Sequence, residues 1–565
     1  MKQIDTGGLS FPELRRRDKY YVDKTLLIKD ILDHNDSGIY LFTRPRRFGK
    51  TTNLSMMDAF FNIEYRGNTW FDDLVISKYP EFEQYKNAFP VIFINLKEAK
   101  ESNYGFFIDR MRAVLYNTFD RHRAVLKSRN LDEDQRAIIQ KVLSKTVEEP
   151  FIRDCIPLLC RILEEHHGRK PVVLIDEYDR PIADSFGSES HRPIMDFLGE
   201  FMNSAIKNNE NLQMAYVTGV MQIPKESMFS DLNNIDVNNV FSKASDERFG
   251  FTDSEVKAIL SDYGHPEKFD EVKRWYDGYR FGDAEVYNPF SIMNYVSKGF
   301  EPAPYWVNMG GDGVIRRLLQ RIGGENFDDI MGLIEGGCIR TRLMPSLRYA
   351  AADSDDLSLY SLMAMAGYLR AVPAGDGLFD ISLPNAEVKG LLEELMYEMK
   401  PISDSLFLEF NRAVIDRDAD RMASTLQTIL LDASYLNLDV ENAYGLVLMT
   451  IMHALAKRYD VKTEYEAGNG RTDIMLRPRE DGTVPMIFEL KRVRSEDALD
   501  AGLDEAMAQI HDRRYYLGMT GKVVLIAASF YKKIPKVRIE VIDVGNDLRF
   551  RRSPPAVSIA CYFHF

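Results

Sequence analysis

The sequence predicts an α/β protein of several domains, with a parallel sheet covered by helices at the start and a second α/β domain at the end. Three observations predict this. Short apolar runs alternate with longer helical patterns over the first part of the chain. The length of 565 residues exceeds what one hydrophobic core holds, so we expect about three or four domains. The composition, 45% apolar and 28% charged, is that of a chain folded throughout.

The same composition excludes several classes of protein. No stretch approaches the ~20 apolar residues of a membrane span, and the N-terminus lacks the apolar core of a secretion signal, so we expect a cytoplasmic protein with no membrane partner. The four cysteines form no CxxC pair, which argues against a disulfide framework and a structural zinc. A net charge of −14 disfavours nonspecific coating of nucleic acid, although residues 491–538 carry ten basic side chains against six acidic ones.

The first domain, which we place at residues 1–245, is predicted from four apolar runs that fit the strands of a parallel sheet. These runs are residues 39–42, 91–96, 172–175 and 214–217, and the helical patterns between them include residues 105–127 and 152–167.

Three further regions separate this domain from the last one. Residues 246–330 are predicted to form a helical lid, entered at FTDSEVKAIL, where Thr252 or Asp253 fits the N-cap and Glu255 the reciprocal position. Residues 331–400 show the helix, strand, turn, strand, helix order of a winged-helix-like module. Such modules bind DNA or pack against neighbours, and the acidic turn GDGLFDISLP favours packing. A helical connector (401–435) leads to an α/β domain at 436–565.

The segment IYLFTRPRRFGKTT has the strand, loop and helix order of a phosphate-binding loop (P-loop). Backbone N–H groups at the helix start would surround the phosphates, Lys50 would reach the β and γ phosphates, and the Thr51 hydroxyl would hold Mg²⁺. Arg44 occupies the position of the first glycine in the GxxxxGK[ST] pattern. Arg46 and Arg47 either add charge to the loop or face solvent. The predicted nucleotide-binding residues of the loop are Arg44, Pro45, Arg46, Arg47, Phe48, Gly49, Lys50, Thr51 and Thr52.

A second element supports the first, because the strand in PVVLIDEYD leads directly into Asp176 and Glu177. Asp176 at the strand tip fits the Mg²⁺ shell, and Glu177 fits the residue that polarises the attacking water. The strand QMAYVTG ends at Thr218, whose hydroxyl either senses the γ-phosphate or closes the strand end. Asp179 and Arg180 are expected to pair with each other. Together these elements predict binding and hydrolysis of ATP with Mg²⁺.

In the last domain, two carboxylates and a lysine are expected to meet on adjacent strands. Side chains two apart on a strand share a face, so Glu489 and Lys491 would point the same way and meet Asp473 from the neighbouring strand. Asp473 and Glu489 would hold Mg²⁺ or Mn²⁺, and Lys491 would assist phosphodiester hydrolysis. Glu441 at a helix start fits the same site, as do Gln509 and Tyr515 on a later helix. The simpler alternative is an exposed carboxylate and lysine on an ordinary sheet.

Several motifs resemble those of a predicted AAA-ATPase-like family of bacteria, related to the STAND and archaeal-type P-loop ATPases. They are YYVDKT (20–25), RPRRFGKT, LIDEYD, TGV, SDLNN (230–234), WYDGY (275–279), YNP and LPNAEV. Members usually carry a C-terminal domain of the PD-(D/E)XK nuclease superfamily, which GRTDIML, FELK and the helix with Gln509 and Tyr515 resemble. The resemblance covers nearly the whole chain, and the arginine at the first P-loop glycine is the family's own form.

The resemblance implies an ASCE-type nucleotide domain in which Lys50, Thr51, Asp176 and Glu177 have the roles given above. It also places Tyr20 or Tyr21 near the adenine. The implied catalytic set of the nuclease is Glu441, Asp473, Glu489, Lys491 and Gln509. Proteins of this type are suspected of roles in defence or mobile-element biology.

The preferred hypothesis is an ATP-controlled nuclease, in which the nucleotide state moves the lid and the winged-helix-like module and so gates the C-terminal metal site on nucleic acid. The alternatives are an ATP-driven signalling switch whose last domain binds nucleic acid or protein without cleaving, a nuclease that holds nucleotide as a structural ligand, and a translocase. DNA and RNA both stay open as substrates. Arg248 is the candidate arginine finger if the chain forms a homo-oligomer.

Overall fold

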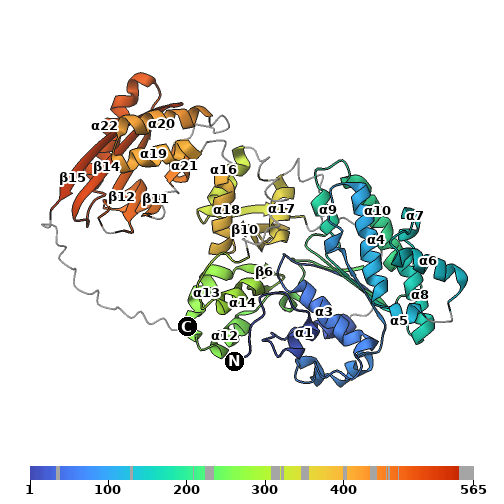
Figure 1. Ribbon diagram of the computed structural model, residues 1–565. Helices are drawn as coiled ribbons and strands as arrows, with labels where there is room; N and C mark the ends of the chain where they lie inside the picture. The colour runs from blue at the N-terminus through green and yellow to red at the C-terminus, as the bar shows by residue number, and fades with distance from the viewer. Residues whose placement is uncertain are drawn as a thin grey trace. The chain divides into compact units, whose positions relative to one another are not determined.

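The computed structural model folds into two compact units, Met1–Met396 and Tyr397–Phe565 (Figure 1). The structure describes residues 1–33, 38–127, 131–207, 209–222, 235–306, 319, 324–344, 356–398, 404–432, 442–452, 455, 458–468, 470–480 and 482–545. Among these residues, no helix is both long enough and apolar enough to cross a bilayer.

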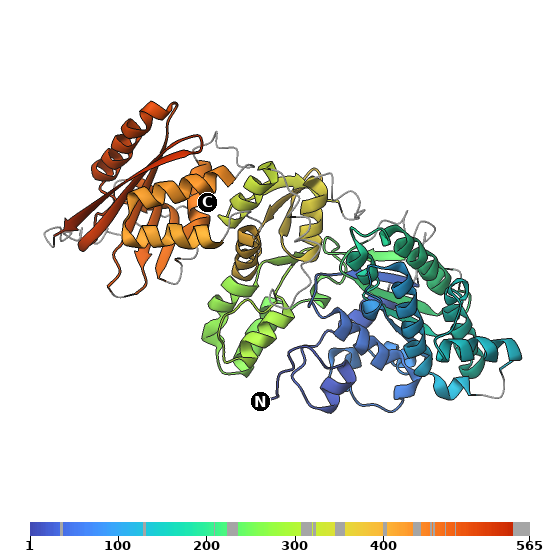
Figure 2. The same ribbon diagram turned by 45° about the horizontal axis from the view of Figure 1, so that its top comes forward.

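A five-stranded parallel sheet forms the centre of the first unit, in the order β2-β3-β4-β1-β5. Its strands are β1 (Ile39–Thr43), β2 (Val91–Asn95), β3 (Val172–Asp176), β4 (Met214–Gly219) and β5 (Ile235–Asn238). The four predicted strands are confirmed, and β5 was not predicted. Every residue of β1, β3 and β4 is buried, because helices cover both faces of the sheet (Figures 1 and 2).

The helices of this sheet domain follow the predicted patterns closely. The long pattern at 105–127 forms α4 (Tyr104–Asp120) and the short α5 (Arg123–Leu126), and the pattern at 152–167 forms α8 (Cys155–His167). The remaining helices are α1 (Phe11–Arg16), α2 (Leu26–Asp33), α3 (Lys50–Phe61), α6 (Glu133–Leu143), α7 (Glu149–Ile152), α9 (Arg180–Ser185) and α10 (His191–Met202).

The predicted helical lid begins with α12 (Asp253–Asp262), and its start shows the predicted capping box. Thr252 is the N-cap: its hydroxyl accepts from the N–H of Glu255, whose carboxylate accepts from the N–H of Thr252 at 2.8 Å. The hairpin β6 (Tyr279–Phe281) and β7 (Ala284–Val286) lies between α13 (Phe269–Tyr276) and α14 (Pro289–Ser297). Aromatic and branched side chains of these helices share one core with the N-terminal segment, including Tyr20 and Val22.

A three-stranded antiparallel sheet, in the order β8-β10-β9, ends the first unit. Its elements are α16 (Gly324–Ile334), β8 (Ile339–Arg342), α17 (Asp356–Ala366), β9 (Arg370–Gly375), β10 (Leu378–Ser382) and α18 (Ala386–Glu398). The succession α17, β9, β10, α18 is the predicted helix, strand, turn, strand, helix. We call the described residues between 324 and 398 the three-stranded module.

The second unit is built on a five-stranded sheet in the order β11-β12-β13-β14-β15, in which only β13 and β14 run parallel. Its elements are α19 (Asp404–Asp416), α20 (Ala419–Asp432), α21 (Asn442–Met452), β11 (Tyr459–Ala467), β12 (Gly470–Pro478), β13 (Met486–Arg492), α22 (Leu499–Arg513), β14 (Gly521–Tyr531) and β15 (Ile534–Val544). Strand alternation divides the side chains into two cores. One face packs on α19, α20 and α21, and the other packs on α22.

The expected connector at 401–435 does not stand apart from this unit. Apolar side chains of α19 and α20, such as Phe410 and Leu426, lie in the same core as Phe488 and Ile526 of the sheet. These two helices are therefore a layer of the second unit, because amphipathic helices of this length need an apolar surface to cover.

Candidate functional sites

The phosphate loop connects β1 to α3 through backbone that only a few residues adopt easily. Gly49 caps α3 with φ +84°, and Arg47 has φ +65°. Lys50 begins the helix, and its ammonium donates to the carbonyls of Arg44 and Pro45, both at 2.8 Å. Burial lowers the pKa of Lys50 to about 8, against the opposing pull of nearby carboxylates. The lysine is thus held inside the loop by weak acceptors that an anion would replace.

The predicted carboxylate at the tip of β3 meets both predicted hydroxyls. Oδ2 of Asp176 accepts from the Thr51 hydroxyl at 2.8 Å, and Oδ1 accepts from the Thr218 hydroxyl at 2.6 Å. These four oxygens come from three residues at the carboxyl edge of the parallel sheet, where ligands of such sheets bind. Hard oxygen donors of this kind fit Mg²⁺, so the residues present are suited to the ion that the sequence implies.

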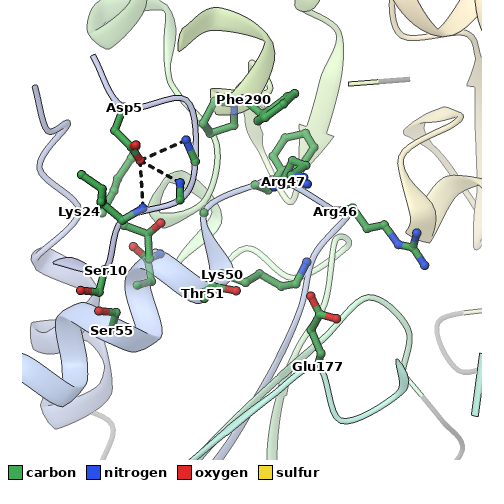
Figure 3. Close-up of a pocket in the computed structure, with 18 of the residues that line it drawn as sticks. Asp5, Ser10, Lys24, Arg46, Arg47, Lys50, Thr51, Ser55, Glu177 and Phe290 are labelled. Carbon is green, nitrogen blue, oxygen red and sulfur yellow. Dashed lines mark hydrogen bonds between the residues drawn. The ribbon is translucent and has the colours of Figure 1, made fainter. Parts of the chain in front are cut away.

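Glu177 follows directly, in a left-handed conformation with φ +52°. This turn separates it from Asp176, and its carboxylate points toward the ammonium of Lys50 (Figure 3). Asp179 does not pair with Arg180, which binds Asp184 instead. The carboxylate of Asp179 instead accepts from the N–H groups of Val220 and Met221 and so fixes the chain that follows β4.

A cavity of about 960 Å³ opens over these residues. Its lining includes Lys50, Thr51 and Glu177 from the P-loop region, and apolar side chains from the lid and the N-terminal segment, namely Val22, Phe251, Phe290 and Met293. One wall is a turn in which Oδ2 of Asp5 accepts from the N–H groups of Gly7, Gly8 and Leu9 at 3.1–3.3 Å (Figure 3). Sequence reasoning missed this turn, whose signal was the Asp-x-Gly-Gly pattern.

The three arginines of the loop have different contacts. Arg44 is fully buried, donates to the carbonyl and side-chain oxygens of Asn238 on β5, and lies over Phe249 and Phe281. Its guanidinium therefore fastens the edge strand and does not line the cavity, although the loop it belongs to does. The guanidinium of Arg47 lies over the Phe290 ring, 4.9 Å from its centroid, while Arg46 points away from Lys50 (Figure 3).

Phe48 and Thr52 also lie on the cavity wall, and Phe48 is packed edge-on against Tyr279 and Phe281. Pro45 and Arg44 are the two loop residues outside the lining. Of the predicted nucleotide-binding loop, residues 46–52 thus face the cavity.

The YYVDKT segment (20–25) lines part of the cavity and is hydrogen-bonded to α12 of the lid. The Tyr20 hydroxyl donates to Asp262 of α12 at 2.7 Å, while the Tyr21 ring packs edge-on against Phe11. Lys24, which sequence reasoning did not single out, donates to both oxygens of Glu255 at 2.6 and 2.7 Å. Arg248, the finger candidate, is paired with Asp30 of the same chain at 2.9 Å.

In the second unit, the predicted carboxylates and lysine share the face of the sheet that α22 covers. The register of β12 and β13 pairs Ile474 with Phe488, which sets the preceding Asp473 across from Glu489. Oδ2 of Asp473 accepts from the N–H of Leu490 at 2.6 Å, and the Lys491 ammonium lies 3.4 Å from Oε1 of Glu489. The structure thus brings all three together.

Glu489 is the most unusual carboxylate of this cluster. It is 1% exposed, and its Oε2 is buried with no hydrogen-bond partner among the described residues. Burial, and then the charge of Asp473, raise the pKa of Glu489 to about 8, against the opposing effect of Lys491. A buried oxygen without a donor beside a second carboxylate fits a divalent cation, which would supply the missing positive charge.

Gln509 on α22 donates to the Tyr515 hydroxyl at 3.0 Å, and Tyr515 is 2% exposed. Burial raises the pKa of Tyr515, and the charges of Glu489 and Asp473 act in the same direction. Gln509 lies on α22 as predicted, whereas Tyr515 does not, because the helix ends at Arg513 and Arg514 turns the chain through a left-handed conformation. The charges of the carboxylate cluster therefore act on a tyrosine just beyond the helix end. Glu441 lies outside the described residues, as does the SDLNN motif.

Two comparisons with known protein families bear on these sites. Residues 6–229 match the model of a family described as predicted AAA-ATPase, and residues 439–538 match that of the PD-(D/E)XK nuclease superfamily. The chain joins an AAA-ATPase-like domain to a PD-(D/E)XK domain. Both expectations from the motifs are thereby confirmed. The chain is also 27% identical over 414 residues, 71% of its own length and 72% of the relative's, to an uncharacterized protein encoded in the vnfD 5′ region of Azotobacter chroococcum mcd 1.

The AAA-ATPase-like domain contains the whole phosphate site, since its match spans β1 to β4, and the PD-(D/E)XK domain contains Asp473, Glu489, Lys491 and Gln509. The basic stretch of the PD-(D/E)XK domain is partly neutralised by its own helix. Lys536 pairs with Asp500 at 2.6 Å, and Arg538 pairs with Asp504. The cationic surface left for a nucleic acid is therefore smaller than the sequence suggests.

Proposed function

We propose that the protein binds and hydrolyses ATP with Mg²⁺ in its AAA-ATPase-like domain, and that the nucleotide state controls a Mg²⁺-dependent nuclease in its PD-(D/E)XK domain. The observation that carries the first part is the contact of Asp176 with both Thr51 and Thr218 beneath the cavity that Lys50 and Glu177 line. The second part is supported by the cluster of Asp473, Glu489 and Lys491 on one face of a sheet.

In the nucleotide site, Lys50 would exchange the carbonyls of Arg44 and Pro45 for β and γ phosphate oxygens, which are stronger acceptors. Thr51 and Asp176 would hold the Mg²⁺, which neutralises phosphate charge when bound. Glu177 would orient the attacking water, and Thr218 would report the γ-phosphate through Asp176. The apolar wall of Val22, Phe290 and Met293 suits a purine base.

In the nuclease site, Asp473 and Glu489 would hold Mg²⁺ or Mn²⁺, which lowers the pKa of a bound water when present. Lys491 would stabilise charge at the phosphorus or hold the nucleophile in line. Gln509 would act from α22, where its hydrogen bond to Tyr515 holds its side chain and where Tyr515 packs in the core on this face of the sheet. Glu441 would complete the set from the start of the preceding helix. The substrate class is a nucleic acid phosphodiester, DNA or RNA.

The test is cleavage of labelled single-stranded and duplex DNA and RNA in Mg²⁺ or Mn²⁺, with and without ATP. Wild type is compared with Lys50→Ala and Asp473→Asn, and with two matched controls on exposed side chains of the same domains, Lys170→Ala and Asp512→Asn. Cutting that is lost in Asp473→Asn, depends on Lys50 and survives in both controls supports the proposal.

Other outcomes point to the alternatives. ATP hydrolysis without cutting of any substrate would favour a signalling switch whose last domain binds nucleic acid or protein. The internal ion pairs of Lys536 and Arg538 favour the form of this second function in which the last domain binds protein, because they reduce the cationic surface left for a nucleic acid. Cleavage that is unchanged in Lys50→Ala would indicate that the nucleotide is a structural ligand. ATP hydrolysis that DNA stimulates, without cleavage of any strand, would indicate a translocase.

A further inference from the structure

Three motifs that the proposed chemistry does not use meet at one place in the first unit. The carbonyl of Asp277, in WYDGY, accepts from the side chain of Asn385, in LPNAEV, at 2.8 Å. Gly278 has φ +90°, and a Cβ there would overlap the carbonyl of Pro384. Ser291, which follows YNP, donates to Glu387 at 2.8 Å. The lid and the three-stranded module are therefore interlocked through backbone and buried polar groups.

Glu387 is the centre of this junction. It lies in the first turn of α18 and is fully buried. Its Oε2 accepts from the Ser291 hydroxyl, and its Oε1 accepts from the backbone N–H of Trp306 at 2.6 Å. A buried carboxylate is costly unless its oxygens are hydrogen-bonded, so both donors are needed to keep it in place.

Trp306 carries the connection on to the phosphate loop. Its indole N–H donates to the carbonyl of Arg46 at 3.1 Å, and its ring contacts Tyr279 and Tyr368. The module touches the loop a second time at Gly367, where a Cβ would lie 2.9 Å from Cβ of Pro45. Ala366 and Tyr368 also line the cavity. The three-stranded module is thus part of the wall of the nucleotide site.

The carbonyl that Trp306 holds is the next one along the loop from those that Lys50 holds. Lys50 binds the carbonyls of Arg44 and Pro45, and Trp306 binds that of Arg46. When a triphosphate draws the ammonium of Lys50 away, the carbonyls of Arg44 and Pro45 lose their hydrogen-bond donor. The loop backbone next to the carbonyl that Trp306 binds is then held by fewer hydrogen bonds. A change at the phosphates therefore reaches α18 through Trp306, whose indole N–H binds the carbonyl of Arg46 and whose backbone N–H binds Glu387.

We propose that Trp306 and Glu387 are positioning residues that link occupancy of the phosphate loop to α18 of the three-stranded module. The inference rests on the proposed binding of ATP and adds the route by which nucleotide binding affects α18. It assigns WYDGY and LPNAEV to that route rather than to catalysis.

The experiment uses the full chain and measures hydrogen–deuterium exchange of α18 with and without ATPγS and Mg²⁺, with nucleotide affinity measured in parallel by calorimetry. We expect saturating nucleotide to change α18 exchange by at least about fivefold, the lower end of usual coupling between sites. Trp306→Phe, which removes the indole N–H and keeps an aromatic ring, should bind nucleotide and lose this change. Trp70→Phe, at a tryptophan outside WYDGY, LPNAEV and the cavity lining, is the matched control and should keep it.

Glu387→Gln is the second variant, in case Trp306→Phe fails to fold, and should weaken the same change. Two results would overturn the inference: wild type that binds ATPγS without altering α18 exchange, or a Trp306→Phe protein that binds ATPγS and shows the same nucleotide-dependent change in α18 exchange as wild type. Wild type that binds no nucleotide in the calorimeter would instead refute the proposed ATP site, and the link with it.

Discussion

The two units place a buried carboxylate on the same kind of element, a strand of a central sheet, and treat it in opposite ways. Asp176 has a hydroxyl donor on each oxygen, from Thr51 and from Thr218. Glu489 has Lys491 near one oxygen, while the other is buried without a described partner. The first carboxylate has a donor on each oxygen before any ligand binds, and the second has one oxygen without a described donor.

This difference teaches what each site needs. Ligand binding at the phosphate loop replaces existing hydrogen bonds, so it depends on ligand groups that are stronger acceptors than a carbonyl. Binding at the nuclease site supplies a charge that the fold leaves out, so it depends on the protonation of Glu489 and on the cation. Four predictions break or sharpen this contrast.

The largest effect is expected from Asp473→Asn. Removing one of two carboxylates from a site that needs a cation should cost several kcal/mol of transition-state stabilisation, and cleavage should fall about 1,000-fold. The measurement is the single-turnover cleavage rate in Mg²⁺, with Asp512→Asn as the control. An unchanged rate would mean that this cluster is an ordinary part of the sheet.

Lys50→Ala should come next. It removes a charge that would bind two phosphates, worth about 3 kcal/mol, so affinity for ATP with Mg²⁺ should fall about 100-fold. Calorimetric titration of the variant and of Lys170→Ala measures this. Equal affinity for ATP in Lys50→Ala and Lys170→Ala would mean that the nucleotide binds at another site or that Lys50 takes no part in binding it.

The pH dependence of metal binding tests the other side of the comparison. With the pKa of Glu489 raised to about 8, the metal-free carboxyl is protonated at neutral pH, and a cation must displace that proton. The apparent Mg²⁺ affinity should therefore be constant above pH ~8 and fall about tenfold per unit below it.

Calorimetry at pH 7 in buffers of different ionisation enthalpy should accordingly detect close to one proton released for each ion bound. Asp473→Asn should lower the pKa of Glu489, because it removes a neighbouring negative charge, and should reduce this release. Metal binding with no proton release at pH 7 would contradict the assignment.

The smallest effect is expected from Thr218→Val. The change removes one of the two donors to Asp176, worth about 1–2 kcal/mol for a charged acceptor. If Thr218 senses the γ-phosphate, kcat for ATP should fall about tenfold with KM little changed. A lower Tm with unchanged kcat would show that the hydroxyl only closes the strand end.

The sequence was most informative where chemistry and periodicity coincide. Strands β1, β3 and β4 are fully buried apolar runs followed at once by polar functional residues, so both the strands and Lys50, Asp176 and Thr218 were predictable. The grouping of Asp473, Glu489 and Lys491 was predictable for the same reason, since alternation on β13 fixes which face Glu489 and Lys491 share; their role in cleavage stays a prediction.

What could not be predicted depends on partners distant in the chain. β5 is only four residues long and half polar, so no pattern marks it. Nothing local shows that the Arg44 side chain turns into the core, because its acceptor, Asn238, lies on that strand. Trp306 stands in no motif, and its role depends on Arg46 and Glu387, which tertiary packing brings to it.

The overlap that a side chain at Gly278 would make with Pro384 has a practical meaning for dissecting this protein. A shortened chain that stops at the end of the lid would keep Gly278, the Ser291 hydroxyl and the backbone N–H of Trp306 but would lose Pro384 and Glu387, which cover them. A chain that stops at the end of the parallel sheet would lose Trp306 itself and leave the carbonyl of Arg46 without that donor. We expect such fragments to aggregate, and we expect the smallest well-behaved ATPase fragment to extend through α18.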